Sequence, residues 1–499
     1  MLGVYLPEDM KAIDEFAIVK LGVPSDVLME TAARALCDEV RLAAKTRPGE
    51  IFFFCGTGNN GGDGIAAARF LRADGYEVRC LLLGDEEKLS PDAKEMTARL
   101  RACGGDLEQF DGSGAPAIIV DCMFGFSFRG ALGGEYLDAA KWINASGAYV
   151  IACDLPSGVD PKTGAVETDA VMADVTLTMT GYKQGLVLAP GSEYAGRVQV
   201  APIGIPEEAM IRRPVASITN RDLAKECFPR RRRNSHKGNY GKVLLLCGSV
   251  GYTGAAAMAA KACLRAGSGL VFLGVPEAVY PILAAKLDEA IVFPLPDENG
   301  MISEKALPGI FSRLADMDAC LIGPGLGRSI ATERVVHGVI RHATCPVVLD
   351  ADGINALSGN MNVLHSVSTP LVLTPHDGEI ARLGCRLSAE GRLEEAKCFA
   401  AEHKVNLLLK GYRTIVTDGE QTFVNTTGNP GMAVGGSGDV LSGILVSLLG
   451  RGIEPMRAAA CAAWLHGAAG DRAAERLGEA SMLPTDLCDA LCEIIRELE

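Results

Sequence analysis

The chain has 499 residues, of which 48% are hydrophobic and 22% charged, and its formal net charge is −14. This composition is typical of a globular protein of roughly two to four domains, and it excludes an extensively disordered chain. A chain this acidic binds nucleic acid poorly overall, so an anionic ligand has to be bound by local groups. The 58 glycines and the low aromatic content of 5% favour an α/β protein with many tight turns over a β-sandwich.

Residues 50–200 alternate short apolar runs with helical stretches, which predicts parallel βαβ units. The expected strands are 50–56, 77–84, 117–122, 149–154 and 174–179, and the expected helices between them are 64–74, 94–103 and 136–145. Two further helices are expected within residues 1–44, divided at Pro24 and Ser25. The pattern predicts a Rossmann-like three-layer αβα domain.

The periodicity stops between Ile203 and Tyr240, which contains three prolines and the run Arg230–Arg233. We place the domain boundary here, with domains 1–212 and 213–499, and interpret the arginine run as a solvated linker rather than a nucleic-acid or nuclear-targeting signal. A second βα series follows, which predicts another αβα domain. Its expected strands are 242–247, 269–275, 319–323, 346–350, 370–374 and 406–410, with a hairpin over 414–416 and 422–425 and helices at 255–266, 440–449 and 456–474.

The sixteen cysteines are scattered singly through apolar runs, and no Cys-x-x-Cys occurs. We expect them to be small buried hydrophobes in a reducing cytoplasm rather than a disulfide framework or a zinc site. The charged residues between Met1 and Lys20 are unlike a signal peptide, and no apolar stretch reaches the about 18 residues that cross a bilayer. The expected location is therefore cytoplasmic, without membrane binding.

Residues 56–64 read Gly-Thr-Gly-Asn-Asn-Gly-Gly-Asp-Gly and lie between an expected strand and an expected helix. Such a turn exposes backbone N–H groups at a helix N-terminus, where phosphate binds favourably. A tight turn with packing glycines is the alternative, but it does not explain two amides and a carboxylate in the turn.

Asp121 and Asp154 each close an expected parallel strand, and Asp154 leads into Leu-Pro-Ser157-Gly. Ligands of open α/β sheets bind outside the carboxyl ends of the strands, so we expect these side chains and Asn60 to meet at one cleft. Their oxygens suit a hard monovalent or divalent cation or a polyhydroxylated substrate. Simple helix capping by each Asp is the alternative.

These motifs resemble the NAD(P)H-hydrate epimerase domain over about residues 1–210. The resemblance implies that Asn60, Asp121 and Ser157 hold a potassium ion. It implies that hydrated nicotinamide dinucleotide contacts Asp154 and two segments, which consist of Asn59, Asn60, Gly61, Gly62 and Asp63, and of Gly125, Phe126, Ser127, Phe128, Arg129, Gly130 and Ala131. Lys183 stands where that family has a lysine and would act with Asp154 in acid–base catalysis, although a plain surface lysine stays an alternative.

In the second half, Gly-Gly-Ser-Gly-Asp at residues 435–439 comes directly before an apolar helix. Backbone N–H groups at that helix start would stabilise charge on a transferring phosphoryl group, and Asp439 would accept the proton of the attacking hydroxyl. Helix capping by Asp439 is the alternative. His376 lies on an expected loop of the same sheet edge and is expected in the cleft, with a place in the core as the alternative.

The Gly-Ser-Gly-Asp sequence before a helix resembles ribokinase-like proteins, and the segments 251–255, 323–327, 374–376 and 429–433 resemble one branch, the NAD(P)H-hydrate dehydratase domain, over about residues 225–499. A ribokinase-like C-terminal domain is therefore implied. The residues implied to contact the hydrate are Ala255, Gly325, His376 and Asp439, and those implied to hold the adenine nucleotide are Lys410, Gly411, Tyr412, Arg413, Thr414 and Gly438. The family phosphorylates the ring hydroxyl of the hydrate and then loses phosphate, and the fused arrangement implies ADP as donor, with Mg²⁺.

The two resemblances imply a bifunctional metabolite-repair enzyme that interconverts R and S hydrates of NADH and NADPH and dehydrates the S form with ADP. Its expected partners are these small molecules, without nucleic acid or membrane, and the chain is expected to form a homo-oligomer. One alternative is a kinase of a small alcohol fused to a cation-binding Rossmann-like module. Another is a nucleotide-binding scaffold whose first half binds a protein.

Overall fold

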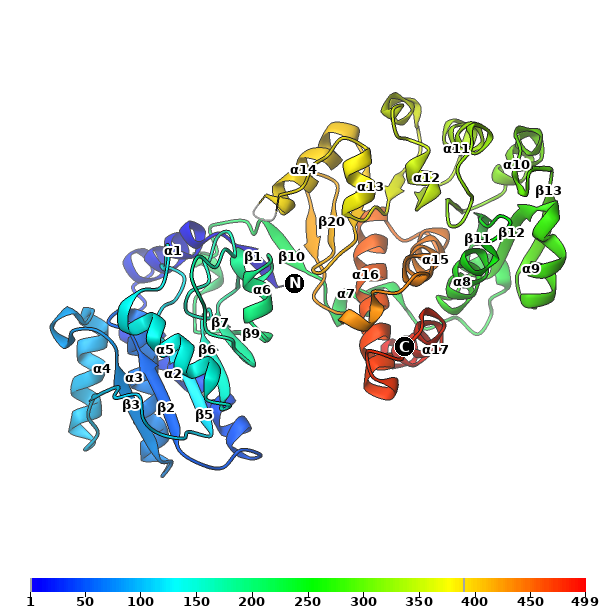
Figure 1. The fold of residues 1–499 in the computed structure, drawn as a ribbon. Coiled ribbons are helices and arrows are strands. Elements are labelled where there is room, and N and C mark those ends of the chain that lie inside the picture. Colours follow the sequence, from blue (N-terminus) through cyan, green and yellow to red (C-terminus); the bar gives the residue numbers. More distant parts are fainter. Residues whose placement is uncertain (1, 389–390) are drawn as a thin grey trace. The chain divides into compact units, whose positions relative to one another are not determined.

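The computed structural model describes residues 2–388 and 391–499. The chain divides into two compact units, Leu2–Ala216 and Ser217–Glu499, and each is built from a parallel sheet and flanking helices (Figure 1). In the described part of the chain, no helix combines the length and the apolar character needed to cross a membrane.

The N-terminal unit is built around a seven-stranded sheet of order β4-β3-β2-β5-β6-β7-β9, in which every neighbouring pair is parallel. Its strands are β2 (Ile51–Cys55), β3 (Val78–Leu82), β4 (Glu108–Gln109), β5 (Ile118–Cys122), β6 (Tyr149–Cys153), β7 (Val175–Met179) and β9 (Arg197–Ala201). A separate parallel pair joins β1 (Gly3–Tyr5) to β8 (Tyr182–Lys183). The helices are α1 (Pro7–Glu15), a π-helical segment (Phe16–Lys20), α2 (Ser25–Ala44), α3 (Asn59–Ala73), α4 (Pro91–Ala102), α5 (Gly134–Ala145) and α6 (Gly191–Tyr194).

Strand β2 shows why this unit has three layers. Its five residues, Ile-Phe-Phe-Phe-Cys, are all fully buried, as in a parallel sheet covered on both faces. Alternate side chains enter opposite cores: Ile51, Phe53 and Cys55 pack with α2, α3 and α4. Phe52 and Phe54 pack with α5, where both contact the ring of Trp142. The predicted three-layer αβα arrangement is confirmed.

The C-terminal unit has a sheet of order β13-β12-β11-β16-β17-β18-β19-β20-β21-β10. The strands are β10 (Ala216–Ile218), β11 (Lys242–Leu246), β12 (Leu270–Pro276), β13 (Ile291–Leu295), β16 (Ala319–Ile322), β17 (Val347–Leu349), β18 (Leu371–Leu373), β19 (Asn406–Leu409), β20 (Ile415–Thr417) and β21 (Thr422–Val424). Neighbours from β13 to β19 are parallel, and β20 is antiparallel to both β19 and β21. The predicted hairpin is therefore confirmed.

Helices α8 and α15, together with α16 and α17, form the core on one side of this sheet. The helices of the unit are α7 (Arg221–Cys227), α8 (Thr253–Arg265), α9 (Tyr280–Lys286), α10 (Leu307–Leu314), α11 (Ile330–His342), α12 (Asp352–Asn355), α13 (Asp377–Arg382), α14 (Arg392–His403), α15 (Ser437–Gly450), α16 (Pro455–Leu477) and α17 (Pro484–Leu498), with a small antiparallel hairpin of β14 (Asp297–Glu298) and β15 (Met301–Ile302). The expected strands of both halves are present to within one or two residues at each end.

Two sequence expectations are wrong in detail. Helix α3 begins at Asn59 rather than Gly64, so the Asn-Asn-Gly-Gly-Asp segment forms its first turns instead of a preceding loop. The glycines permit this, because a Cβ on Gly61 would lie 1.8 Å from the carbonyl oxygen of Gly56. Residues 203–240 contain β10 and α7, and the exposed run Arg230–Arg233 lies inside the C-terminal unit rather than between the units.

All sixteen cysteines are free thiols, and most of them are buried in the two cores. The prediction that they act as small buried hydrophobes is confirmed for these. Cys103 and Cys398 are exceptions on the surface.

Close packing of α15 against α8 supplies a test of this architecture. A Cβ on Gly443 would lie 2.3 Å from the carbonyl oxygen of Ala259, so Gly443→Ala should destabilise the protein by about 1–2 kcal/mol despite its better helix propensity. The matched control is Gly309→Ala in α10, where no atom lies within 4 Å and a neutral or slightly stabilising effect is expected. Urea unfolding followed by circular dichroism measures both, and equal effects would contradict the packing argument.

Candidate functional site

A buried ion pair lies at the carboxyl edge of the N-terminal sheet. Asp154 follows β6 with a positive φ of 68°, and its Oδ1 accepts hydrogen bonds from Lys183 Nζ, Thr178 Oγ1 (3.2 Å) and the Met179 N–H (3.2 Å). Lys183 is only 1% exposed and also donates to Thr178 Oγ1 (3.0 Å) and the Met179 carbonyl (2.8 Å). The alternative of a surface lysine is therefore wrong, because Lys183 is buried. A buried ion pair is stable only when further hydrogen bonds satisfy both charged groups, as they do here.

Two more carboxyl groups lie near this pair. Asp14 on α1 has its pKa raised to about 6 by burial and by the charge of Asp154, against the opposing effect of Lys183. Burial also raises the pKa of Asp63, in the first turns of α3, well above its usual value, and the charges of Asp154 and Asp14 add to this effect. A carboxyl group with a pKa of about 6, such as that of Asp14, can exchange protons near neutral pH, which is a property of catalytic sites.

Asp121 and Ser157 form a second polar centre at the same edge. Asp121 is fully buried; its Oδ1 accepts from Ser157 Oγ (2.7 Å) and its Oδ2 from the Ser157 N–H (2.8 Å). Burial raises the pKa of Asp121 to about 6, although its hydrogen bonds to Ser157 and the Met123 N–H oppose this. Ser157 Oγ also accepts the N–H of Phe124 (3.0 Å), which fixes the loop that follows β5.

Asn60 reaches the same loop from the start of α3. A Cβ on Gly125 would lie 3.2 Å from both Asn60 Oδ1 and Asp154 Oδ2, so any larger residue would require these side chains to shift. The amide nitrogen of Asn60 is buried and has no hydrogen-bond partner in the structure. Asn60 and Asp154 therefore lie on either side of Gly125, and Ser157, which Asp121 holds, contacts the preceding residue Phe124. That these residues form one ligand-binding cleft stays a prediction.

The remaining residues of the two predicted N-terminal segments differ in exposure. Phe126 donates its N–H to Asp154 Oδ2 (3.0 Å), and Phe128 is buried against the ring of Phe124. The exposed side chains are those of Asn59, Ser127, Arg129 and Ala131, and Gly130 follows with a positive φ. Gly61 and Gly62 are buried and closely packed, so at these two positions only the backbone N–H and C=O groups could contact a ligand.

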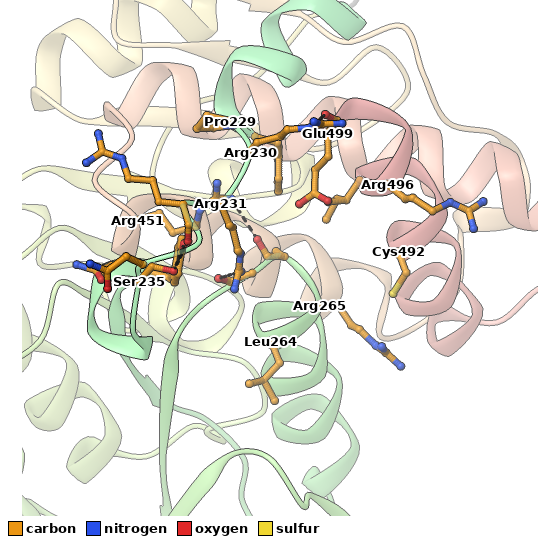
Figure 2. Close-up of a pocket in the computed structure, with 18 residues that line it drawn as sticks. Pro229, Arg230, Arg231, Ser235, Leu264, Arg265, Arg451, Cys492, Arg496 and Glu499 are labelled. Carbon is orange, nitrogen blue, oxygen red and sulfur yellow. Dashed lines mark hydrogen bonds between the residues drawn. The ribbon is translucent and has the colours of Figure 1, made fainter.

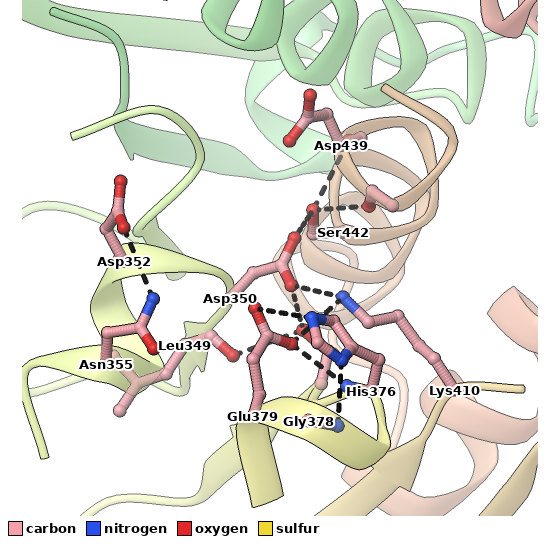
Figure 3. A network of polar contacts seen from close by, with 12 residues as sticks. Leu349, Asp350, Asp352, Asn355, His376, Gly378, Glu379, Lys410, Asp439 and Ser442 are labelled. Atoms are coloured by element: carbon pink, nitrogen blue, oxygen red, sulfur yellow. Dashed lines mark hydrogen bonds and ion pairs between the residues drawn. The ribbon is translucent and has the colours of Figure 1, made fainter. Parts of the chain in front are cut away.

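In the C-terminal unit, Asp350 joins the ends of several elements (Figure 3). It follows β17 and is 1% exposed. Its Oδ1 accepts hydrogen bonds from Lys410 Nζ (2.7 Å) and Thr374 Oγ1 (2.9 Å), and its Oδ2 accepts one from Ser442 Oγ on α15 (2.9 Å). This carboxylate therefore fixes the start of α15 relative to the ends of β18 and β19.

Lys410 presents a cation at the N-terminus of α15. Its Nζ lies 3.8 Å from Glu379 Oε2, and a Cβ on Gly438 would lie 3.3 Å from it. Burial alone would lower the pKa of Lys410, but the charges of Asp350, Glu379 and Asp439 outweigh this and raise it. The ammonium group is therefore permanently charged beside N–H groups that have no partner within the helix.

Asp439 is the third residue of α15, and its pKa is raised to about 7. Burial is the main cause, followed by the charges of Asp350 and Asp352, while Lys410 lowers the pKa. The helix has Gly436 at its N-cap, with φ 107°, and no side chain caps it. The alternative that Asp439 only caps the helix is therefore wrong.

Ala255 and Gly325 lie side by side, since a Cβ on Gly325 would be 3.1 Å from the Cβ of Ala255. Ser249 Oγ donates to the Gly325 carbonyl (2.8 Å). A cavity of about 590 Å³ lies next to them, lined by Ser249, Val250, Tyr252, Asn299, Met301, Gly327, Arg328 and Asp352. Such a volume suits a small organic ligand.

His376 is the N-cap of α13, where its Nδ1 accepts the N–H of Gly378 (3.0 Å) and its side chain is 55% exposed. The alternative of a core histidine is therefore wrong. Its Nε2 lies 3.6 Å from Glu379 Oε1, which links it to Lys410.

The segment after Lys410 forms an exposed turn. Gly411 and Arg413 have positive φ, Tyr412 is 56% exposed, and Thr414 Oγ1 donates to the Gly411 carbonyl (3.1 Å). Arg392, in the first turn of α14, donates to the Lys410 carbonyl (3.1 Å) and pairs with Asp377. Arg392 therefore fixes the start of this turn at Lys410, while Tyr412 in its middle is exposed.

Sequence reasoning missed Asp14, Asp350, Glu379 and Arg392 as members of these sites. Asp350 had a signal, because it closes an expected strand within the segment Asp-Ala-Asp-Gly-Ile-Asn. Asp14 and Arg392 lie in helices without a neighbouring motif, and only the tertiary structure brings them to the sites. Within the described ranges, 2–388 and 391–499, no group of three or more His, Cys, Asp or Glu could hold a metal ion.

Comparison with known proteins finds a family match for each half of the chain. A family model described as NAD(P)H-hydrate dehydratase matches residues 243–493, and one described as YjeF-related protein N-terminus matches residues 25–185. A ribokinase-like superfamily protein from Enterococcus faecalis V583 is structurally similar, with a TM-score of 0.51 and 28% identity, covering 57% of this chain and 96% of that one.

Full-length relatives share both halves. The bifunctional NAD(P)H-hydrate repair enzyme Nnr of Moorella thermoacetica is 40% identical, over 98% of this chain and 96% of its own. The protein of the same name from Salinibacter ruber is 35% identical, over 98% and 95%. By its two sites, its two αβα units and this identity along its whole length, the chain belongs to the family of bifunctional NAD(P)H-hydrate repair enzymes.

Proposed function

We propose that the N-terminal unit interconverts the R and S forms of hydrated NADH and NADPH, and that the C-terminal unit dehydrates the S form at the expense of ADP. The second assignment rests on Asp439, whose carboxyl group has a pKa of about 7. Asp439 lies near Lys410 in the first turn of α15, a helix whose N-terminus no side chain caps. A base of this pKa matches the operating pH of a cell.

In the dehydratase, Asp439 takes the proton of the ring hydroxyl as that oxygen attacks the β-phosphoryl group of ADP. AMP leaves, and loss of inorganic phosphate together with a neighbouring ring proton restores the double bond of the dihydronicotinamide. The N–H groups at the start of α15 and the ammonium of Lys410 stabilise the charge on the transferring phosphoryl group. Mg²⁺ bound to ADP would supply further positive charge to the phosphates.

Substrate contacts follow from this placement. We assign Ala255, Gly325 and His376 to contacts with the hydrate and Asp439 to its hydroxyl. Gly325 lies against Ala255 and Tyr252, and Tyr252 lines the cavity beside Ser249. The turn from Gly411 to Thr414, with Lys410 and Gly438, holds the adenine nucleotide. Asp350 is a positioning residue, because it is fully buried and acts by fixing Lys410 and α15.

In the epimerase, Asp154 is the group that meets the substrate, and Lys183 acts through it. Lys183 already directs its three donors to Asp154, Thr178 and the Met179 carbonyl, so it orients the carboxylate and offsets its charge. The other oxygen of Asp154 faces the loop beginning at Gly125. The neighbouring carboxyl group of Asp14, with its pKa raised to about 6, supplies a further proton-exchanging group beside Asp154.

Asn60, Asp121 and Ser157 fit a monovalent cation, for which we propose potassium. Asp121 is a fully buried carboxylate without a cationic partner in the described residues, and the amide oxygen of Asn60 faces the loop that Ser157 fixes. One carboxylate, one hydroxyl and one amide oxygen form a donor set of low charge, which suits K⁺ better than a divalent ion. The bound ion supplies positive charge that favours an anionic substrate and fixes the loop after β5.

The free cysteines support a reducing, cytoplasmic location, and the partners are small molecules. Assembly as a homo-oligomer stays a prediction.

Asp439→Asn should lower the dehydration rate by about 10²–10⁴-fold, the usual contribution of a general base. In the unsubstituted protein, kcat/KM should fall about tenfold per pH unit below about pH 7, because the raised pKa leaves Asp439 protonated there. The recovery of dihydronicotinamide absorbance with ADP measures both. Epimerisation, followed by separating the R and S forms, is the control and should be unchanged; substantial dehydration by the variant would contradict the assignment.

Asp121→Asn should abolish the dependence of epimerisation on potassium, because it removes the only formal negative charge of the proposed site. KCl, compared with tetramethylammonium chloride, should raise the melting temperature of the unsubstituted protein but not of this variant. Asp138→Asn, at an exposed position of α5, is the matched control and should keep both responses. A potassium response that survives in Asp121→Asn would refute the site.

ADP should support dehydration much better than ATP, because the additional phosphoryl group of ATP would have to occupy the substrate's space. Initial rates on the S hydrate at matched ADP and ATP concentrations with Mg²⁺ measure this preference, and AMP should inhibit competitively without reacting. An ATP rate equal to or above the ADP rate would refute the choice of donor, while leaving the dehydratase assignment in place.

A further inference from the structure

The C-terminal unit contains a cavity of about 680 Å³ that belongs to neither proposed active site (Figure 2). Its walls come from residues 228–240, from the end of α8, from the residue after α15 and from the last turns of α17. None of the motifs that define the two active sites contributes a lining residue.

Arginine dominates this cavity. Six arginines line it, namely Arg230, Arg231, Arg232, Arg265, Arg451 and Arg496, against the single acidic residue Glu499. The whole chain has 62 acidic and 48 basic residues, so the cavity concentrates positive charge in an acidic protein. Like charges at this density repel each other: burial, and then the charge of Arg231, lower the pKa of Arg451. An anion would relieve this repulsion.

Part of the arginine set is held rigidly by the fold. Arg451 donates to the carbonyls of Cys227 (2.8 Å) and Ala266 (3.3 Å), and it stacks on the ring of Phe228. Arg231 donates to the Gly267 carbonyl (2.7 Å) and stacks on Tyr240. Because each guanidinium has five N–H donors, both keep donors for a ligand while their position is fixed.

Of the other four arginines, Arg230 donates to the Glu499 carbonyl (3.2 Å), and the remaining three are available to a ligand. Among the described residues, Arg232 and Arg496 have no carboxylate partner, and Arg265 has only Asp489 at 3.9 Å. Guanidinium groups bind phosphate oxygens in a bidentate manner, which makes arginine clusters suited to phosphorylated ligands. Leu264, Cys492 and Ile495 add an apolar wall beside them.

We propose that this cavity binds a phosphorylated organic molecule of nucleotide size, with its phosphates on the arginines and its organic part against Leu264, Cys492 and Ile495. The volume lies within the range of about 300–1,000 Å³ usual for small-molecule sites. A concave site in an acidic chain favours a small ligand over RNA, which needs an extended basic surface.

The site lies far from the dehydratase centre. Arg451 directly follows the last residue of α15, and Asp439 lies in the first turn of the same helix. Fourteen helical residues span about 20 Å, so a nucleotide held at one end leaves the other end accessible. The two sites can therefore be occupied and tested separately.

The test is titration calorimetry of the full chain with ADP and with inorganic pyrophosphate, without Mg²⁺. The variant Arg232→Gln/Arg265→Gln/Arg496→Gln removes three cavity arginines, and Arg213→Gln/Arg233→Gln/Arg341→Gln makes the same charge change at exposed positions outside the cavity. We expect two ADP-binding events in the unsubstituted protein and in the control. One of them should weaken by at least about 30-fold in the cavity variant, the effect of losing several charge-assisted hydrogen bonds.

Both variants should keep the dehydration rate within about twofold, which shows that they are folded. ADP should occupy the affected site more tightly than pyrophosphate, since pyrophosphate lacks the organic part. Equal losses in both variants would show general charge attraction and overturn the proposal, as would an unchanged titration of the cavity variant. Pyrophosphate binding as tightly as ADP, or single-stranded RNA binding more tightly than ADP at this site, would overturn the assigned ligand class.

Discussion

A buried carboxylate that follows a sheet strand and holds a lysine from elsewhere in the chain organises each unit of this protein. Asp154 follows β6 and pairs with Lys183; Asp350 follows β17 and pairs with Lys410. Each carboxylate is almost completely buried, so its charge must be met by the partner and by further hydrogen bonds. The geometry around it is therefore tightly constrained, and the catalytic groups take their positions from it.

The same burial tunes the acids around each pair. Asp439 near Asp350 has a pKa of about 7, and Asp14 near Asp154 has a pKa of about 6. In both cases burial is the main cause, a second carboxylate adds to it, and the lysine opposes it. Each buried ion pair thus shifts the pKa of a neighbouring carboxyl group, which can then exchange protons near neutral pH.

The chain has fewer basic than acidic residues, and two regions of the C-terminal unit concentrate positive charge where an anion could bind. The dehydratase centre that we propose has one lysine, Lys410, at the N-terminus of α15, and both favour negative charge. The cavity beside α17 is lined by six arginines and one acidic residue, Glu499, so positive charge dominates it.

The order of strands along the chain, the position of most site loops and the nature of the chemistry could be predicted from the sequence. Apolar runs such as 51–55 and 243–246 are strands because parallel strands are buried on both faces, and polar residues that end such strands must share one edge of the sheet. Asp121 and Asp154 were predicted in this way, whereas Asn60 and Asp439 were predicted from the glycine-rich segments that come before helices. Only the tertiary structure decided what depends on contacts between distant segments: that Lys183 is buried, that Asp14 lies beside Asp154, that Asp350 holds Lys410, and that Arg230–Arg232 line a cavity with Arg496. Burial and pKa are properties of the surroundings of a side chain, and those surroundings come from residues whose separation along the chain says nothing about their distance in space.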